Sequence, residues 1–259
     1  MIKAFLKRLF PRRIRMWRYA IAENLELQDL CRPAPMRDYS GYDDYWQKRG
    51  TLNAIFRRWE IAAAIVPRDA TLLDTGCGTG EFLQYLKSVR PDVKAEGADD
   101  SHEAIAMTQS LGFSVRQLDL VRDSVESAFD IVTCFEVIEH ISEAEHALRT
   151  LKSAFRKQLI VSIPNIGYIG SRIRLALFGR FPITNCQLHI KEHLRHWTVL
   201  DFKEWIALED LRVVRIEGQY GPRWLPWRRF PSLFAKGIVY VIEHAPASSH
   251  APASAVTHP

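Results

Sequence analysis

Residues 72–83 read LLDTGCGTGEFL, an apolar run that ends in an acid and is followed by three glycines at alternate positions. The pattern predicts a strand, a tight turn and then a helix. Glycine takes up positive φ without strain and lets the backbone approach a ligand closely. Gly76, Gly78 and Gly80 therefore predict an open turn at a helix N-terminus, on which a nucleoside-bearing ligand can lie.

The sixth position of the turn indicates which ligand this is. A dinucleotide-binding turn has glycine at its first, third and sixth positions, whereas the sixth position here is Glu81. A pyrophosphate would meet that carboxylate. S-adenosylmethionine carries no phosphate and ends in an ammonium and a sulfonium group, which suit the acid Asp74. A second strand over 93–99 ends in Asp99, about 19 residues after Gly80, from where a carboxylate reaches ribose hydroxyls. The two acids predict S-adenosylmethionine as the cofactor.

Four segments in sequence order resemble the class I S-adenosylmethionine-dependent methyltransferases, and the resemblance covers about residues 70–243. These segments are 72–80, 97–101, 117–120 and 129–140. The resemblance implies that Asp74 lies near the methionine amino group, that Asp99 binds the ribose and that Asp119 binds the adenine amino group. The full set of cofactor-binding residues expected on this basis is Asp74, Gly76, Cys77, Gly78, Gly80, Asp99, Asp100, Asp119, Leu120, Phe135 and Glu136.

Each of these features also has a purely structural interpretation. The glycines could form a turn that binds nothing, although both acids would then be coincidences. Asp99 could belong to the start of the next helix, for which Asp100 and Ser101 are the better capping residues. Asp119 follows a strand, where aspartate is often only a turn former.

The composition is that of a globular enzyme. The 259 residues are 47% hydrophobic, which is enough for one substantial core, and the length does not demand a second domain. The four cysteines are scattered without a Cys-x-x-Cys pair, which favours reduced thiols in the cytoplasm over a disulfide framework or a zinc knuckle. No apolar run approaches the roughly 18 residues of a membrane span, so we expect neither a spanning helix nor a secretory signal.

Positive charge is concentrated in residues 1–22. The chain has a formal charge of +5, and this segment holds seven Lys or Arg residues, no acid and several interleaved apolar residues. One interpretation is an interfacial segment on an anionic membrane, at its cytoplasmic face. The alternatives are a basic helix packed on the catalytic domain, a frayed tail or a targeting presequence.

Alternating strand and helix patterns predict an α/β fold with a doubly wound, mostly parallel sheet of seven strands, the Rossmann-like methyltransferase fold. A helical pattern over 43–66 precedes the first strand. The expected strands are 70–75, 93–99, 113–118, 129–135, 157–163, 211–217 and 237–243, and the expected helices are 80–89, 102–111, 142–155 and 198–208. Ligands bind at the carboxyl ends of such strands. Residues 164–197 interrupt the alternation, and we interpret them as an insertion that covers the substrate.

This pattern gives a simple domain organisation. We expect residues 1–41 to form a basic amphipathic extension with N-terminal helices and residues 42–243 to form the methyltransferase domain. Residues 244–259 repeat His-Ala-Pro-Ala-Ser and are poor in apolar residues, so we expect a disordered tail.

Chemistry beyond cofactor binding centres on Glu136, Glu139 and His140, which would share one face if a helix begins there. His193 from the insertion could complete the group. The arrangement resembles the ubiquinone-biosynthesis O-methyltransferases and the small-RNA 2′-O-methyltransferases, which implies two glutamates and two histidines around a divalent metal that engages a substrate hydroxyl. Three interpretations stay open: a helix start with glutamates near the helix dipole, a general base at either histidine, and a metal site.

Residues 162–182 resemble the MetW-like proteins, which have the methyltransferase fold and are tied to methionine biosynthesis, whereas the Glu-x-x-Glu-His run departs from that group. We therefore weigh two functions. One is an O-methyltransferase acting on a small, glycan or lipid-linked acceptor near a membrane. The other is a catalytically silent S-adenosylmethionine-binding partner that regulates another enzyme. A nicotinamide oxidoreductase is a distant third. We expect a monomer or homodimer and no nucleic-acid partner, because no extra RNA-binding domain is present.

Overall fold

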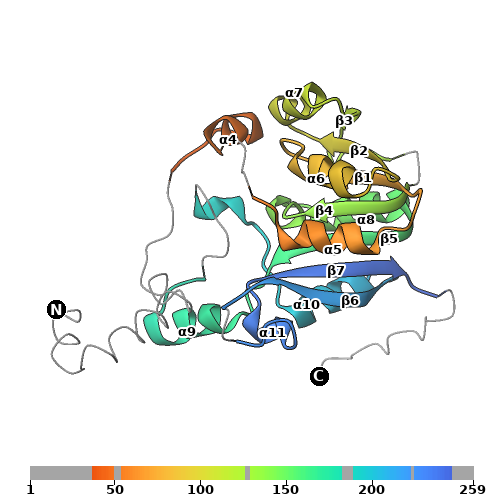
Figure 1. The fold of residues 1–259 in the computed structure, drawn as a ribbon. Coiled ribbons are helices and arrows are strands. Elements are labelled where there is room, and N and C mark those ends of the chain that lie inside the picture. Colours follow the sequence, from red (N-terminus) through yellow and green to blue (C-terminus); the bar gives the residue numbers. More distant parts are fainter. Residues whose placement is uncertain (1–36, 50–53, 126–128, 183–188, 223–224, 247–259) are drawn as a thin grey trace, which may run out of the picture.

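A seven-stranded sheet forms the centre of the molecule (Figure 1). The computed structural model describes residues 37–49, 54–125, 129–182, 189–222 and 225–246. The strands are β1 (Thr71–Thr75), β2 (Lys94–Asp99), β3 (Val115–Gln117), β4 (Phe129–Phe135), β5 (Phe155–Pro164), β6 (Leu211–Tyr220) and β7 (Gly237–His244). Their order in the sheet is β3-β2-β1-β4-β5-β7-β6.

The predicted mostly parallel, doubly wound sheet is confirmed. All neighbours from β3 to β5 pair in parallel, and among the described strands β7 alone runs antiparallel, to both β5 and β6. The chain leaves β1 toward β2 on one side and later returns to β4 on the other. The carboxyl ends of β1 and β4 therefore flank the topological switch point, where α/β sheets bind ligands.

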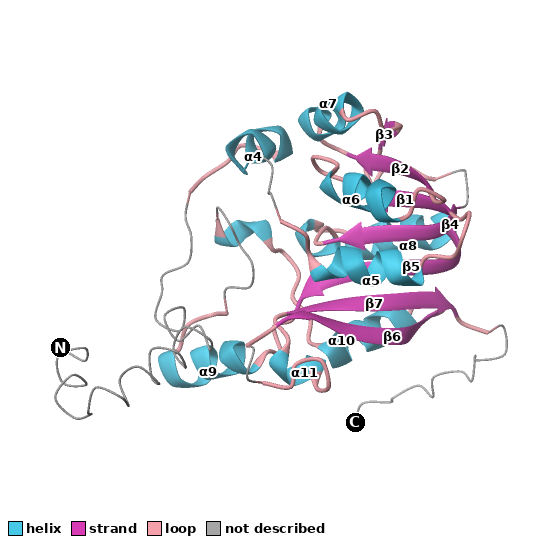
Figure 2. Ribbon diagram, viewed as in Figure 1, coloured by secondary structure: helices cyan, strands magenta, loops and turns pink. Residues whose placement is uncertain are grey.

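Helices cover both faces of the sheet (Figure 2). They are α4 (Tyr42–Arg49), α5 (Arg57–Ile65), α6 (Glu81–Val89), α7 (His102–Ser110), α8 (Ala144–Ala154), α9 (Ile169–Phe178), α10 (Val199–Ala207) and α11 (Pro231–Phe234), with short 3₁₀ turns η1 (Ile138–His140) and η2 (Ile190–Glu192). None of the described helices is long and apolar enough to cross a membrane.

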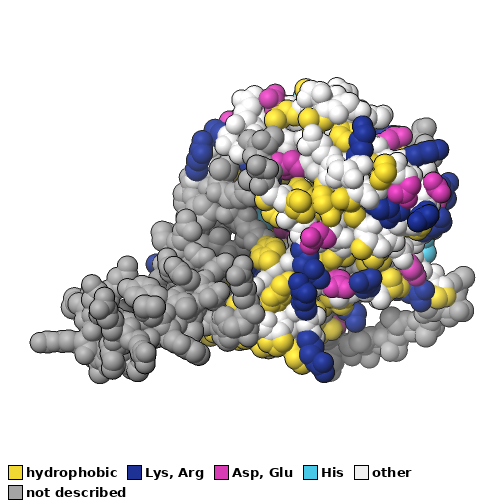
Figure 3. Space-filling view, in the orientation of Figure 1, with side chains coloured by type: hydrophobic (Ala, Val, Ile, Leu, Met, Phe, Trp, Pro, Cys, Tyr) yellow, Lys and Arg dark blue, Asp and Glu magenta, His cyan; other side chains and the backbone are white. Residues whose placement is uncertain are grey.

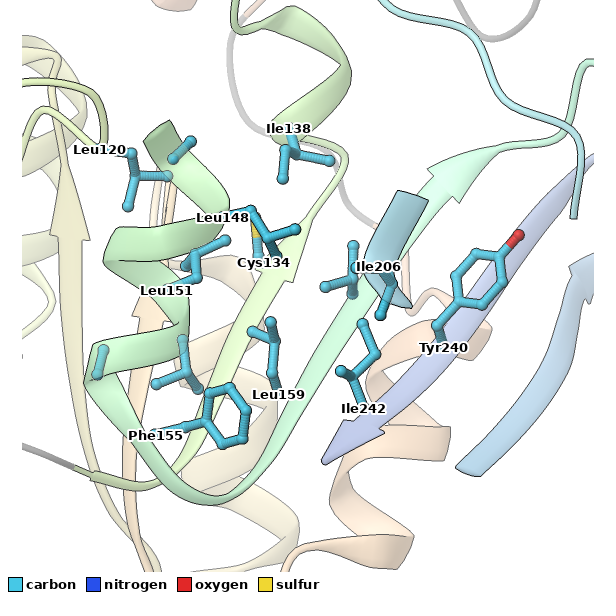
Figure 4. Packing of buried hydrophobic residues seen from close by; sticks show 14 of the residues in the cluster. Leu120, Cys134, Ile138, Leu148, Leu151, Phe155, Leu159, Ile206, Tyr240 and Ile242 are labelled. Carbon is cyan, nitrogen blue, oxygen red and sulfur yellow. The ribbon is translucent and has the colours of Figure 1, made fainter. Parts of the chain in front are cut away.

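Each face of the sheet has its own apolar core. On one face, Leu148 and Leu151 of α8 and Ile206 of α10 lie in one buried cluster with Leu159 and Ile242 of the sheet (Figure 4). On the other face, α5 and α6 pack over β1, β4 and β5. Burial on both faces explains why the central strands read as nearly continuous apolar runs. The two cores fix the strand ends that carry the site.

The helical pattern over 43–66 forms two helices instead of one. α4 ends at Arg49, residues 54–56 are not helical, and Phe56 has an extended backbone (φ −95°, ψ 142°) just before α5. α5 packs on the sheet, whereas α4 lies against α7, where Asp43 accepts hydrogen bonds from Ser101 and the Glu103 amide. The break therefore places α4 over the carboxyl ends of the strands. Residues 1–22 and most of the C-terminal tail lie outside the described residues.

Residues 164–197 contain a helix that the sequence pattern did not predict. This helix, α9, ends at Gly179, which has the left-handed conformation (φ +58°) that caps helices readily. The two ends of the segment are held together, because Asn165 and Trp197 form a parallel bridge. The Asn165 side chain also donates to the carbonyl oxygens of Ser232 and Ala235. The segment thus leaves the sheet at the carboxyl end of β5 and returns to the same place.

Candidate functional site

The glycine turn has the backbone that the sequence predicts. Gly76, Gly78 and Gly80 have φ of +67°, +54° and +77°. A Cβ atom on Gly76 would lie 2.3 Å from Val137, and one on Gly78 would lie 2.4 Å from the ring of Trp46. Side chains are therefore excluded both by conformation and by space, and α4 covers the turn through Trp46.

The turn is held in place by the end of β2. The amides of Gly76 and Cys77 donate to the carbonyl oxygen of Ala98 at 2.8 and 3.0 Å. The amide of Gly78 donates to Asp99 Oδ2 at 2.9 Å. Burial raises the pKa of Asp99, although its hydrogen bonds from backbone amides oppose that rise. The side chain of Asp99 therefore fixes the turn.

A cavity of about 630 Å³ opens at the carboxyl ends of the strands, which is within the usual range for small-molecule sites. The predicted residues that line it are Asp74, Gly76, Cys77, Gly78, Asp99, Asp100, Asp119, Leu120, Phe135, Glu136, His140 and His193. Two predicted residues are outside the lining. Gly80 precedes α6 and faces Thr108, and Glu139 is buried, with its carboxylate beside the lining residues His140 and His193.

Asp74, which is buried, and Arg58, which is half-buried, are two groups of opposite charge in this cavity. The hydroxyl of Thr133 donates to Asp74 Oδ1 at 2.7 Å, and burial raises the pKa of Asp74 to about 7. Arg58 of α5 opposes that rise through its positive charge, and its buried Nε has no hydrogen-bond partner among the described residues. Sequence reasoning missed Arg58. The sequence feature that could have indicated Arg58 is the Arg57-Arg58 pair at the start of an apolar helix.

Asp119, which follows β3, is compatible with both interpretations made from the sequence, a turn former and a residue of the ligand site. Asp119 Oδ1 accepts hydrogen bonds from the amides of Val121 at 2.8 Å and Arg122 at 3.3 Å, which is the geometry of a turn-forming aspartate. Asp119 also lines the cavity. In the neighbouring helix α7, Ser101 is the capping residue, because its hydroxyl accepts from the Ala104 amide.

Glu136 does not lie on a helix, so it shares no helical face with Glu139 and His140. Its backbone is left-handed (φ +55°), and η1 begins only after Val137. Glu136 Oε1 accepts hydrogen bonds from Ser162 Oγ and from Gln219 Nε2, both at 2.9 Å. Gln219 in turn accepts from Arg58 Nη1 at 3.2 Å. The amide of Gln219, another residue that the sequence did not reveal, therefore bridges a guanidinium and a carboxylate of the cavity.

Glu139, His140 and His193 form a tight group. One possible ligand atom from each residue lies within 4.8 Å of the others. Glu139 is 1% exposed, and neither of its carboxylate oxygens has a hydrogen-bond partner in the part of the chain that the structure describes. His140 Nδ1 donates to the carbonyl oxygen of Glu192 at 2.6 Å, since a carbonyl can only accept. The other nitrogen, Nε2, is then unprotonated and lies 4.0 Å from Glu139 Oε1.

The insertion brings His193 to this group. The amides of Leu194 and Arg195 donate to the backbone carbonyl of Glu139 at 2.8 and 3.0 Å, and the rings of His140 and His193 are 4.8 Å apart. Burial lowers the pKa of His140, and burial together with repulsion from His140 lowers that of His193 to about 3. Burial raises the pKa of Glu139 well above its usual range. Both imidazoles are thus neutral near pH 7, so each can bind a cation or accept a proton.

Known proteins share this fold and part of the sequence. An S-adenosylmethionine-dependent methyltransferase from Clostridium acetobutylicum is 14% identical over 79% of this chain and 99% of its own (TM-score 0.55). A methyltransferase solved in complex with the Haloferax volcanii Trm112 activator is 16% identical over 80% and 95% of the two chains (TM-score 0.54). The ubiquinone biosynthesis O-methyltransferase of Xanthomonas campestris pv. campestris is 24% identical over 176 residues, 65% of this chain and 72% of its own.

The fold and the glycine turn define a class I S-adenosylmethionine-dependent methyltransferase, whose cofactor is S-adenosylmethionine. The expected fold, class and cofactor are confirmed. The model of a family described as "Methionine biosynthesis protein MetW" matches residues 57–242. The chain belongs to the MetW family.

Proposed function

We propose that this methyltransferase transfers the methyl group to a hydroxyl oxygen of a small, glycan or lipid-linked acceptor, bound where His140 and His193 line the cavity. The observation that carries the proposal is the carboxylate of Glu139, buried without a hydrogen bond beside two neutral imidazoles. A buried carboxylate without a partner lowers stability, so we infer that it serves a ligand. The similarity to an enzyme named as an O-methyltransferase supports oxygen as the acceptor atom.

The cofactor's place follows from the charges on the other side of the cavity. We assign Asp74 to the ammonium group of the methionine moiety and Arg58 to its carboxylate, because the two are opposite in charge and line the cavity, and because Arg58 Nε is buried without a partner among the described residues. Asp99 at the end of β2 is assigned to the ribose hydroxyls. Asp119 and the Leu120 amide are assigned to adenine. This order points the sulfonium methyl toward the two histidines.

The three residues of the buried group fit a divalent cation. The fit rests on the partnerless atoms of Glu139 and His193 and on the nitrogen and oxygen donors that transition metals accept. The hydrogen bond from His140 to the Glu192 carbonyl fixes its ring, as is usual for metal-binding histidines. When bound, such a cation would lower the pKa of the acceptor hydroxyl. The histidines and Glu139 would hold that oxygen in line with the methyl group.

The test uses the full-length protein, S-adenosylmethionine labelled in its methyl group, and fractionated lipid and metabolite extracts. We expect one fraction to yield a product with the label on oxygen, and His193→Ala to abolish that labelling. His193→Ala should retain binding of S-adenosylhomocysteine. The matched control, His146→Ala, changes an exposed histidine of α8 and should remain active.

Two outcomes would revise the proposal. Labelling that survives a chelator but is lost in His193→Ala would make the group a general base without metal. Tight cofactor binding with no labelled product in any fraction would favour the second candidate function, a catalytically silent partner protein. The observation in favour of that candidate is the family match itself, since its description names methionine biosynthesis.

A further inference from the structure

One face of α4 forms part of the cavity wall. Tyr42, Tyr45, Trp46 and Arg49 all line the cavity, and their spacing places them on the same side of the helix. No residue of α4 belongs to either apolar core, and none is fully buried. Figure 3 shows charged side chains of both signs on the outer surface at the upper left, where Figure 1 draws α4. The helix thus covers the cavity without joining a core of the protein.

This face of α4 reaches two parts of the cavity. The ring of Trp46 lies over Gly78 of the glycine turn. One helical turn earlier, the ring of Tyr42 lies 6.5 Å from that of His140, edge to face. Because a short helix moves as one unit, α4 can leave the glycine turn only by leaving the histidine as well.

Polar contacts hold α4 in this position. Asp43 accepts hydrogen bonds from the Ser101 hydroxyl and the Glu103 amide at the start of α7. Just before the helix, Asp38 pairs with Lys191 of η2. Segments with few buried apolar contacts open most readily, so α4 can lift without disturbing either core.

A further contact joins α4 to the glycine turn. Arg49 Nη2 lies 4.0 Å from Oε2 of Glu81, the first residue of α6, and the two side chains are only 10% and 17% exposed. The Arg49 guanidinium also lies 4.7 Å from the centre of the Trp46 ring. One cation therefore contacts both the residue that ends the turn and the ring that covers it. Low exposure strengthens the attraction, because less water lies around the charges.

Glu81 also has a local role. The helix dipole favours an acid in the first turn of a helix, and Glu81 occupies that position in α6. This role explains an acid at residue 81, but it does not explain a poorly exposed arginine that faces it from another helix. The dipole acts whether or not α4 is closed, whereas the pair with Arg49 exists only in the closed position. The two roles therefore predict different results when both charges are exchanged.

We infer that Glu81 and Arg49 are positioning residues that hold α4 closed over the bound cofactor. Exchange of S-adenosylmethionine and S-adenosylhomocysteine then requires the two charges to separate and α4 to lift, as a lid does. Closure also sets Tyr42 beside His140, so the same movement covers the histidines. The pair acts on the established cofactor, whichever acceptor is methylated.

The test measures how fast the full-length protein releases tritium-labelled S-adenosylhomocysteine when an excess of the unlabelled compound is added. Glu81→Gln and Arg49→Gln should each raise the dissociation rate by about fivefold, the upper end for an exposed ion pair, because this pair is partly buried. Exchange of both charges, Arg49→Glu with Glu81→Arg, should return the rate to within about twofold of the unaltered protein, because the pair is restored. The matched control is Lys48→Gln, which removes a cation from the outer face of the same helix and should leave the rate unchanged.

Salt gives a second measurement, which decides the question even if the exchanged variant does not fold. In the unaltered protein the dissociation rate should rise between about 0.05 and 0.5 M sodium chloride, since ions weaken the attraction between the two charges. The increase should be smaller in Glu81→Gln, which lacks the pair. An equal increase in both proteins would overturn the inference.

Three further results would also overturn it. Release from Glu81→Gln at the rate of the control would show that the pair does not hold α4. A lower melting temperature without faster release would assign Glu81 to the start of α6 alone. Fast release from an exchanged variant that melts like the unaltered protein would mean that Arg49 contacts the cofactor directly. Because these measurements follow only S-adenosylhomocysteine, a lack of methyl transfer to any acceptor fraction would count against the proposed function and leave the role of the pair intact.

Discussion

The acidic side chains on the two sides of the cavity differ in their hydrogen bonding. On the side that we assign to the cofactor (the cofactor side), Asp74, Asp99 and Asp119 each accept at least one hydrogen bond from the protein itself. On the side that we assign to the acceptor (the acceptor side), Glu139 accepts none from any described residue, although it is more deeply buried than Asp99. The acids of the cofactor side are therefore held by the protein itself, whereas the carboxyl group of Glu139 is not hydrogen-bonded by any described residue.

This difference separates two kinds of preorganisation. The glycine turn gains its shape from backbone bonds to β2, so it is rigid without a cofactor. The Glu139 group is held in place through backbone contacts, while both carboxyl oxygens of Glu139 and Nδ1 of His193 have no hydrogen-bond partner among the described residues. Substitutions on the first side should impair folding and cofactor binding together. Substitutions on the second should separate activity from stability.

The largest expected effect on cofactor binding is that of Gly76→Ala. A Cβ there meets Val137 at 2.3 Å and the backbone has φ +67°. Clash and strain together should weaken S-adenosylhomocysteine binding by about 100-fold or more, since strain alone amounts to about 1–3 kcal/mol. Isothermal titration calorimetry measures this. The control is Gly112→Ala, which has φ +81° but no atom within 4 Å of the added Cβ. Equal losses in both variants would show that contact with Val137 is unimportant.

The next effect is that of Glu139→Gln. We expect methyl transfer to fall by about 10²–10⁴, the range for a group that handles the acceptor proton. The melting temperature should stay level or rise, because the change removes a buried ionisable group without a partner. Labelling rates and thermal melts test the two halves of this expectation. Glu143→Gln, at an exposed position, is the control. A less stable but fully active Glu139→Gln protein would mean that Glu139 has only a structural role.

A smaller effect is the pH dependence of cofactor binding. The pKa of Asp74 is raised to about 7, so in the free protein its carboxyl group is protonated below that pH and ionised above it. The cofactor's ammonium group needs the ionised form. Affinity for S-adenosylhomocysteine should therefore fall by up to about tenfold per pH unit below 7 and level off above it. Titrations from pH 5.5 to 8.5 test this. Asp74→Asn should bind weakly with a flat profile, and Asp210→Asn should follow the unaltered protein.

The smallest effect tests the bridge between the two sides. Gln219→Leu removes both the hydrogen bond to Glu136 and the one from Arg58. We expect kcat to fall by about fivefold, in keeping with about 0.5 kcal/mol for each of the two hydrogen bonds, with little change in KM for the cofactor. Gln158→Leu removes an amide contact to Glu243 far from the cavity and is the control. A change in KM alone would assign Gln219 to cofactor binding.

The sequence predicted the glycine turn and the acids at the strand ends, because their requirements are local. Three glycines and an acid at the end of each of two strands need only strand periodicity to be placed, and Gly76, Gly78 and Asp99 lie where they were expected. The rest of the candidate site depends on long-range packing. Arg58 reaches the cavity only because α5 packs on the sheet, and Gln219 only because β6 lies beside β7.

The sequence patterns also failed to predict two local features of the structure. The sequence around Glu136 reads as helical and does not reveal that the backbone of this residue is left-handed. Because of this conformation, the expected helical face does not form. The helix α9 lacked the usual apolar stripe, because its apolar residues lie partly on the exposed side. His193 was expected from its residue type, and its contact with Glu139 arises from backbone bonds that no spacing rule encodes.

The position of β7 has a consequence for the order in which the protein is made. β7 follows β6 in the chain but lies between β5 and β6, and it is the one described strand with which β6 pairs. β1 to β4 can therefore assemble while translation continues, since domains begin to fold from the N-terminal side. Gln219 reaches Glu136 only after residues 237–244 have left the ribosome and joined β5. A growing chain should hold its glycine turn early and gain the Gln219 bridge last.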